Sequence, residues 1–256
     1  MNVLNPIKEW LEEVGKVTSF SFRFFREVIR PPFEIREFLV QCFEIGYKSI
    51  FLVAVTGFIM GVVFTLQTRP TMIEFGAVSY MPGMISISIV REIGPMITAL
   101  ICAGKIGSGI AAELGSMKVT EQIDAMEVSG TNPFNFLVVS RVLATTLMLP
   151  LLVVLADAMG IWGSFIVENL KGDVTFKLYF YKAFKVLFYS DVIPAMTKSY
   201  FFGFAIGIVG CYKGYHSTKG TAGVGRTANE AVVISSLLLF LIDFLAVLVA
   251  DIFYEI

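Results

Sequence analysis

The sequence predicts an all-α integral membrane protein. An N-terminal helix lying in the membrane interface precedes five membrane-spanning helices, and a short cytoplasmic helix separates the second span from the third. Hydrophobic residues make up 56% of the 256 residues, whereas charged residues make up only 16%, against about 25% in an average soluble domain. The apolar residues gather in runs close to the length of about 20 residues that a helix needs to cross a bilayer.

The first element is an amphipathic segment ahead of the spans. We divide the chain into residues 1–48, which carry interfacial and elbow helices, and residues 49–256, which form the five-span domain. Val17, Phe24 and Val28 recur at helical spacing among basic residues. This pattern is typical of a helix lying in the membrane interface. A soluble helix packed on a partner would show the same pattern.

Five apolar segments follow as candidate spans. The third is too long for a perpendicular helix and is expected to tilt, to bend near Pro150 or to project beyond the membrane. The second, fourth and fifth each contain charged residues. In chain order the predicted spans are Ile50–Leu66, Met84–Ala103, Phe134–Val167, Val192–Tyr212 and Ala231–Ala250.

The distribution of Lys and Arg orients these spans. With the N-terminus inside, the inner segments 1–48, 105–130 and 213–226 hold twelve Lys and Arg, and the outer segments hold five. Positive charge favours the cytoplasmic side, so we expect the N-terminus in the cytoplasm and the C-terminus outside. The outer segment 173–191 alternates aromatic residues with lysines. This alternation is typical of a helix at the outer interface, or of one that contacts an extracytoplasmic partner.

Arg91 and Glu92 stand inside the second predicted span. Each charge at the centre of a membrane helix costs about 2.5–3.5 kcal/mol on insertion scales, so neither is expected to face lipid. We expect both to face a polar cavity or to meet Asp243, Lys198 or Asp157. Two interpretations stay open at this point: a polar site on a transport path, and a purely structural ion-pair network.

A capped helix is predicted at about residues 108–129, on the cytoplasmic side. Thr120 is a plausible N-cap for its second part, and Glu121 and Asp124 complement the helix dipole in the first turn. Gly130 ends it. A helix in a loop where a few turn residues would suffice suggests docking to a soluble partner, although its charged face could also be merely solvated.

Several kinds of chemistry find no support in the sequence. No GxxxxGK[ST] motif for nucleotide binding occurs. The three cysteines are scattered and suggest neither a disulfide framework nor a metal site. His216, the single histidine, has no catalytic constellation around it. The net charge of −1 gives no basic field for nucleic acid. We therefore expect no catalytic residues, no metal site and no nucleic-acid partner.

Two long segments resemble one known family. The run REIGPMITALICAGKIGSGIAAELGSMKVTEQIDAMEVSGTNPFNFLVVSRVLA (residues 91–144) and the run GYHSTKGTAGVGRTANEAVV (residues 214–233) are similar to the MlaE-type permeases. These permeases, which include the YrbE- and TGD-like proteins, are the membrane subunits of ATP-binding-cassette (ABC) transporters that move lipids together with MCE-domain partners. The N-terminal 48 residues and the outer segment carry no such motif.

The resemblance implies a fold, a function and partners. The fold is a homodimer of five-span subunits in the bacterial inner membrane, and each subunit transports phospholipids without enzymatic activity of its own. The cytoplasmic helix becomes a coupling helix on a separate ABC ATPase dimer, which binds the ATP and Mg²⁺. A periplasmic MCE protein sits on the outer face, and some members add a STAS-domain regulator. The coupling residues expected here are Glu113, Lys118, Glu121, Asp124 and Glu127.

The resemblance also places Arg91 and Glu92 near a lipid-binding cavity at the dimer axis. Phe64, Phe75 and Tyr80 surround the first outer loop and could grip acyl chains on the same path, although an interfacial aromatic belt explains them equally well. Two other functions stay open. An ion-coupled secondary carrier would use Glu92 or Asp243 as its proton site, and a membrane anchor would hold a cytoplasmic complex without transporting anything.

Overall fold

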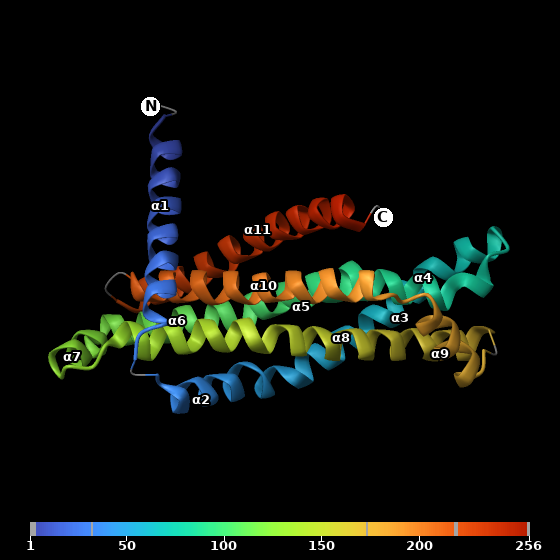
Figure 1. The fold of residues 1–256 in the computed structure, drawn as a ribbon, viewed down its shortest axis with the longest axis horizontal. Coiled ribbons are helices and arrows are strands. Elements are labelled where there is room, and N and C mark those ends of the chain that lie inside the picture. The colour runs from blue at the N-terminus through green and yellow to red at the C-terminus, as the bar shows by residue number, and fades with distance from the viewer. Residues whose placement is uncertain (1–3, 32, 173, 218–219, 255–256) are drawn as a thin grey trace. The chain divides into compact units, whose positions relative to one another are not determined.

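The computed structural model describes residues 4–31, 33–172, 174–217 and 220–254, and every regular element in this part of the chain is helical (Figure 1). Five helical stretches are long and apolar enough to cross a membrane. The all-α fold class and the five predicted spans are therefore confirmed. In chain order the stretches are Ile35–Glu74, Val78–Val119, Phe134–Gly172, Tyr189–Tyr215 and Thr221–Ile252.

The five helical stretches are longer than the apolar runs from which the spans were predicted, because helical structure continues into the polar residues on either side. The α-helices are α1 (Leu4–Glu27), α2 (Ile35–Ile45), α3 (Ile50–Glu74), α4 (Met81–Ser88), α5 (Gly94–Cys102), α6 (Ser108–Val119), α7 (Gln122–Val128), α8 (Ser140–Gly172), α9 (Phe176–Lys185), α10 (Tyr189–Tyr215) and α11 (Thr221–Tyr254). Short 3₁₀ turns precede α3 and α4.

Three π-helical turns interrupt or precede these α-helices. They lie at Ile89–Ile93 between α4 and α5, at Ala103–Gly107 between α5 and α6, and at Phe134–Val139 before α8. Each π-turn adds a residue to the helical repeat and shifts the faces of the residues that follow. Such turns are frequent at functional sites.

The residues divide into two compact units. The first comprises residues up to 43, 103–145 and 204–237, and the second comprises residues 44–102, 146–203 and from 238 onwards. The first unit holds α7 and the loop before α11, and the second holds α9 and the segment between α3 and α4. Apart from residues 44–48, the segments predicted to be cytoplasmic therefore belong to the first unit, and those predicted to be outside belong to the second.

In the second unit, α3 and α8 are in direct backbone contact. A Cβ added to Gly61 would lie 1.9 Å from the carbonyl oxygen of Gly160, and one added to Gly57 would lie 2.7 Å from that of Ala156. Small residues spaced four apart let two membrane helices approach this closely and gain dispersion contacts.

The helix α9 packs onto α4 and the end of α8 in the same unit (Figure 1). Its Tyr179 is buried with Met81 and Ile161 in one apolar cluster, and the Tyr179 hydroxyl donates a 2.7 Å hydrogen bond to Ser164 Oγ. The predicted helix in the outer segment is therefore present. Its position at a membrane interface stays a prediction.

In the first unit, aromatic contacts hold α1. The buried Phe20 ring meets the rings of Phe134 and Tyr212 edge-on, at centroid distances of 5.0 and 5.6 Å. The Arg23 guanidinium lies over Phe134, 4.2 Å from the ring centroid, which is a favourable cation–π geometry. The C-terminal part of α1 therefore packs on its own chain.

The predicted helix at 108–129 is divided into two. It breaks at Glu121, which has a left-handed backbone (φ 60°) between α6 and α7. Thr120 is not the N-cap that the sequence suggested. It ends α6, and its hydroxyl donates back to the Ser116 carbonyl 2.8 Å away. A threonine can satisfy the preceding turn as readily as it caps the next helix.

Candidate functional site

Arg91 and Glu92 lie in the π-turn between α4 and α5. Ile89 and Val90 of the same turn are buried, so the apolar half of the turn packs inside the second unit. Gly94 and Pro95 follow directly. The two charges thus stand where the regular helix is locally widened, a position often used for function.

Both charged side chains are paired. Arg91 Nε donates to Asp191 Oδ1 at 2.7 Å. Lys198 Nζ donates to Glu92 Oε2 at 2.6 Å and to Asp243 Oδ1 at 2.9 Å. We call these five residues the ionic cluster. It joins the π-turn to α10 and α11 entirely within the second unit.

Burial differs sharply across the ionic cluster. The Lys198 side chain is 3% exposed, while that of Glu92 is 48% exposed. The ammonium is therefore enclosed and its charge is matched by two carboxylates, as a buried cation requires. Glu92 offers an accessible carboxylate edge to anything that enters beside it.

The sequence predicted part of this cluster. Lys198 and Asp243 were expected partners, and the structure confirms that Lys198 binds Glu92 and links it to Asp243. Asp157 makes no hydrogen bond to either Arg91 or Glu92 among the interactions of the described residues. Asp191 was not foreseen. It lies at the end of the aromatic and lysine-rich outer segment, where an acidic residue is expected to be solvent-exposed and gives no sign of a buried ion pair.

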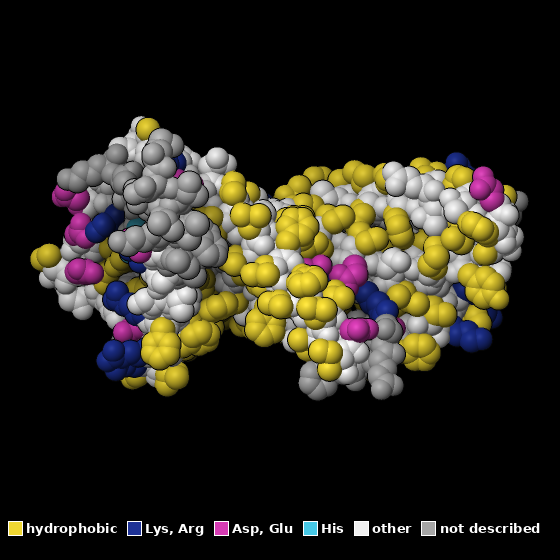
Figure 2. Space-filling view, turned by 90° about the horizontal axis from the view of Figure 1, so that it is seen from above, with side chains coloured by type: hydrophobic (Ala, Val, Ile, Leu, Met, Phe, Trp, Pro, Cys, Tyr) yellow, Lys and Arg dark blue, Asp and Glu magenta, His cyan; other side chains and the backbone are white. Residues whose placement is uncertain are grey.

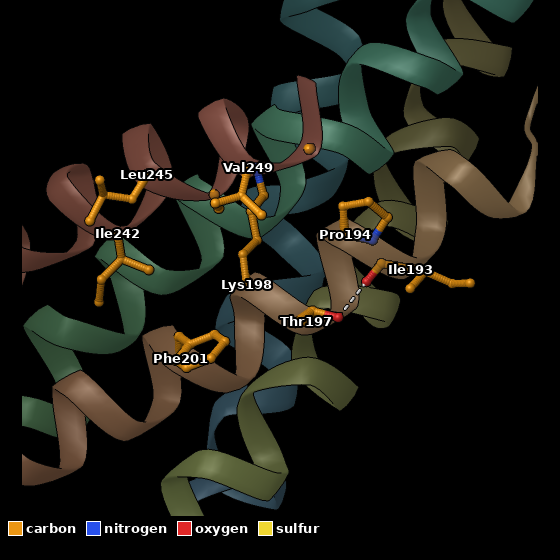
Figure 3. A pocket seen from close by; sticks show the side chains of 10 residues that line it. Ile193, Pro194, Thr197, Lys198, Phe201, Ile242, Leu245 and Val249 are labelled. Atoms are coloured by element: carbon orange, nitrogen blue, oxygen red, sulfur yellow. Dashed lines mark hydrogen bonds between the residues drawn. The ribbon is translucent and has the colours of Figure 1, made fainter. Parts of the chain in front are cut away.

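A cavity of about 690 Å³ lies beside the ionic cluster, between α10 and α11. Its size falls within the range of about 300–1,000 Å³ typical of ligand sites. Figure 3 shows side chains of the two helices facing one another across it, with Lys198 extending from α10 towards α11. Its lining is apolar except for Thr197 and Lys198: Ile193, Pro194, Thr197, Lys198, Phe201, Ile242, Leu245, Ala246, Val249 and Ala250.

A second, smaller cavity of about 190 Å³ adjoins the first and is charged. Arg91, Glu92, Asp191, Lys198 and Asp251 all line it. The two cavities share four lining residues, two from α10 and two from α11: Pro194, Lys198, Ala246 and Ala250. An apolar chamber thus opens beside a charged one. Figure 2 shows one face of the molecule, on which many hydrophobic side chains are exposed and acidic and basic side chains meet.

The three aromatic residues proposed for the lipid path lie elsewhere. Phe64 is partly buried against the apolar cluster of α4 and α9. Phe75 and Tyr80 are each 75% exposed, at the end of α3 and just before α4. None of them lines either of the two cavities described above. Their role on a lipid path stays a prediction.

The residues predicted for coupling lie around α6 and α7. Glu113 accepts a 2.8 Å hydrogen bond from the buried Arg141 of α8, and Lys118 pairs with Asp124 at 2.7 Å. Glu121 and Glu127 are exposed. The short helix ends at Val128, which is 91% exposed. The role of these residues in coupling to a partner stays a prediction.

Comparisons with known proteins identify a family and several relatives to which this chain is similar. The profile of one family, described as Permease MlaE, matches residues 38–249. A probable ABC transporter permease protein of Rickettsia felis is 36% identical over 260 residues, covering 100% of this chain and 99% of the relative. A probable ABC transporter permease protein of Synechocystis is 33% identical, covering 92% of this chain and 89% of that protein. The chloroplastic protein trigalactosyldiacylglycerol 1 of Arabidopsis thaliana is 33% identical, covering 82% of this chain and 60% of that protein.

Proposed function

Because this chain belongs to the MlaE permease family, we propose that it is the membrane subunit of an ABC transporter that moves phospholipids between membranes. The chain carries out no chemistry itself. A separate ATPase dimer binds and hydrolyses ATP with Mg²⁺, and a periplasmic MCE-domain protein exchanges lipid with the outer face. The assembly lies in a bacterial inner membrane, with the N-terminus cytoplasmic and the C-terminus periplasmic.

The observation that carries this proposal is the pair of adjoining cavities in the second unit. A phospholipid has apolar chains and a charged headgroup, and the larger cavity is apolar while the smaller one is lined by Arg91, Glu92 and Lys198. A site for a uniformly polar solute would have no use for the apolar chamber. A site for a plain hydrocarbon would have no use for charged side chains beside the apolar chamber.

The relatives support the same function. Several are named as probable ABC transporter permeases, and the Arabidopsis protein is named after a glycolipid. These names agree with a lipid cargo and with an ATPase as the source of energy. A second copy of the chain would complete the transport path, since closed two-fold dimers are the commonest assembly.

The arrangement of α6 and α7 suggests how the ATPase acts on the permease. α7 presents exposed acids and Val128 to a partner, and Arg141 ties the preceding helix α6 to α8 through Glu113. In our proposal a push on α7 is passed to α6 and, through this ion pair, to α8. Some members of the family add a STAS-domain regulator, which would contact the same cytoplasmic side.

Purification of the tagged full-length chain in mild detergent tests the function. We expect an ABC ATPase, an MCE-domain protein and phospholipid to co-elute with it. Recovery of bound lipid together with transport that proceeds without any ATPase would instead support the ion-coupled carrier. A chain that recovers neither lipid nor an ATPase would refute the proposal.

Charge reversal tests the docking surface. Replacing Glu121, Asp124 and Glu127 with Lys should abolish co-purification of the ATPase, because it reverses the charge of the surface that α7 and the residue before it expose. A control reverses two exposed acids away from α7, Glu12→Lys and Glu74→Lys, and should leave the complex intact. If the α7 variant retains its ATPase as well as the control does, α7 is not the docking surface.

A further inference from the structure

Asp157 is a buried acid that the ionic cluster does not include. It lies in the middle of α8 and is only 6% exposed. Its Oδ1 atom is fully buried and has no hydrogen-bond partner among the described residues. A carboxylate in such a position is expensive unless a proton or a cation accompanies it.

The backbone of α5 is shaped around this carboxyl group. A Cβ added to Gly94 would lie 1.7 Å from Asp157 Oδ1, so the oxygen occupies the space that any larger residue would fill. Gly94 directly follows the π-turn that carries Arg91 and Glu92. Asp157 therefore packs against the residue that follows the π-turn, so a change in its charge would act close to Arg91 and Glu92.

The cations near Asp157 already have partners. α3 contributes no titratable group from Ile50 to Leu66, and α8 contributes no other charged group between Arg141 and Glu168. Asp157 contacts Gly94, which directly follows the π-turn, so the charged groups next to this contact along the chain and across its ion pairs are those of the ionic cluster. Arg91 is paired with one carboxylate, and Lys198 is shared between two. These groups are Arg91 and Glu92 of the π-turn, Asp191 and Lys198 of α10, and Asp243 of α11.

We propose that Asp157 is a proton-binding site, and that the presence of its proton decides which carboxylates Lys198 pairs with. With the proton bound, Asp157 is neutral and Lys198 holds Glu92 and Asp243 as observed. When the proton leaves to water, the new carboxylate is a third anion competing for Lys198, the buried cation of the ionic cluster. Lys198 then turns towards Asp157 and releases Glu92, its more exposed partner, into the charged cavity.

The consequence for lipid rests on the proposed function. A released Glu92 changes the charge of the cavity that would hold the headgroup. Lipid binding would then vary with pH in the wild-type chain and would stop varying once residue 157 can no longer ionise. The proton site itself requires no lipid transport and can be tested separately.

Infrared spectroscopy of the full-length chain in lipid nanodiscs tests the proton site. We expect a carbonyl stretch of a protonated carboxyl group at neutral pH, and its loss in Asp157→Asn. The control Asp191→Asn removes a carboxylate already paired with Arg91, so it should leave that band in place. If Asp157→Asn is not recovered folded, Asp157→Thr removes the same carboxyl group from a similar volume. Glu168 also has a buried oxygen without a partner and could contribute to the band in every variant, so a band whose intensity is unchanged by loss of the Asp157 carboxyl group overturns the proposal.

The effect on Lys198 is tested by lipid retention. Bound phospholipid is measured by mass spectrometry after nanodisc extraction at a series of pH values. We expect wild-type retention to change with pH and Asp157→Asn to retain lipid at the wild-type low-pH level throughout. Identical pH profiles for the two chains would overturn the coupling to Lys198. Absence of lipid from both would refute the proposed function while leaving the infrared result on the proton site intact.

Discussion

Replacing Lys198 with Met should destabilise the protein strongly, because one buried ammonium serves two carboxylates. Met keeps the apolar stem and removes only the charge. Breaking a buried ion pair by deleting one partner costs about 3–5 kcal/mol. Glu92 is 48% exposed and Asp243 is 21% exposed, so Glu92 can recover hydration while Asp243 recovers little. The lower end of the range is therefore expected, a loss of about 3 kcal/mol in the free energy of unfolding.

The assay is equilibrium unfolding of the purified chain in mixed detergent micelles titrated with a denaturing detergent. A loss of about 3 kcal/mol corresponds to a change of more than 100-fold in the unfolding constant. A second substitution separates the stranded charge from lost packing. Asp243→Asn in the Lys198→Met background should recover about 1–2 kcal/mol, since the uncompensated carboxylate is then gone.

Two results would refute this reasoning. A loss below about 0.5 kcal/mol in Lys198→Met would place the pair in the class of solvent-screened surface bridges. A double variant no more stable than Lys198→Met would show that the stranded Asp243 carboxylate contributes nothing. The ionic cluster would then be a set of contacts without energetic coupling.

Three further substitutions examine the packing of the helices. Gly61→Ala places a Cβ 1.9 Å from a carbonyl oxygen of α8 and should lower the free energy of unfolding by about 1–3 kcal/mol, which is seen as a lower melting temperature in detergent. The control Gly15→Ala has open space around it and should lose no stability. Tyr179→Phe leaves Ser164 without its buried partner and should cost about 1–3 kcal/mol in the same measurement. Burial raises the pKa of Tyr179 to about 12, so an absorbance titration that stops near pH 11 should give the same curve for Tyr179→Phe and wild type. Arg141→Gln breaks the ion pair to α6 and should cost about 2 kcal/mol, below the range for fully buried pairs because the partner carboxylate is exposed; a smaller loss in chemical unfolding would argue against Arg141 as the link between α6 and α8.

The spans could be predicted from the sequence because a bilayer imposes one simple requirement. A run of about 20 apolar residues has few alternatives to a membrane helix, and all five runs appear as helices. Arg91 and Glu92 stood out for the same reason, since charge within such a run is expensive. The spans and the two charged positions were therefore predictable because both depend on the cost of removing polar groups from water.

The details that escaped prediction depend on backbone geometry. The π-turn at Ile89–Ile93 leaves no mark in an apolar pattern, because inserting one residue changes the facing of side chains but not their composition. The break at Glu121 was hidden because a left-handed backbone is rare outside glycine and asparagine. Thr120 was misassigned because one hydroxyl can serve two different helices.

The geometry of α10 explains why the order of the two charges in the π-turn matters. Asp191 and Lys198 are seven residues apart, nearly two full turns, so they lie on one face of α10 about 10 Å apart along its axis. Arg91 meets the acid and Glu92 meets the base. The reversed order, Glu then Arg, would set each charge against its like, and neighbours on one helix could not exchange places to relieve it. The sequence pair Arg-Glu is thus complementary to the pair Asp and Lys on α10, and the accessible face of Glu92 is what remains for a ligand once that match is made.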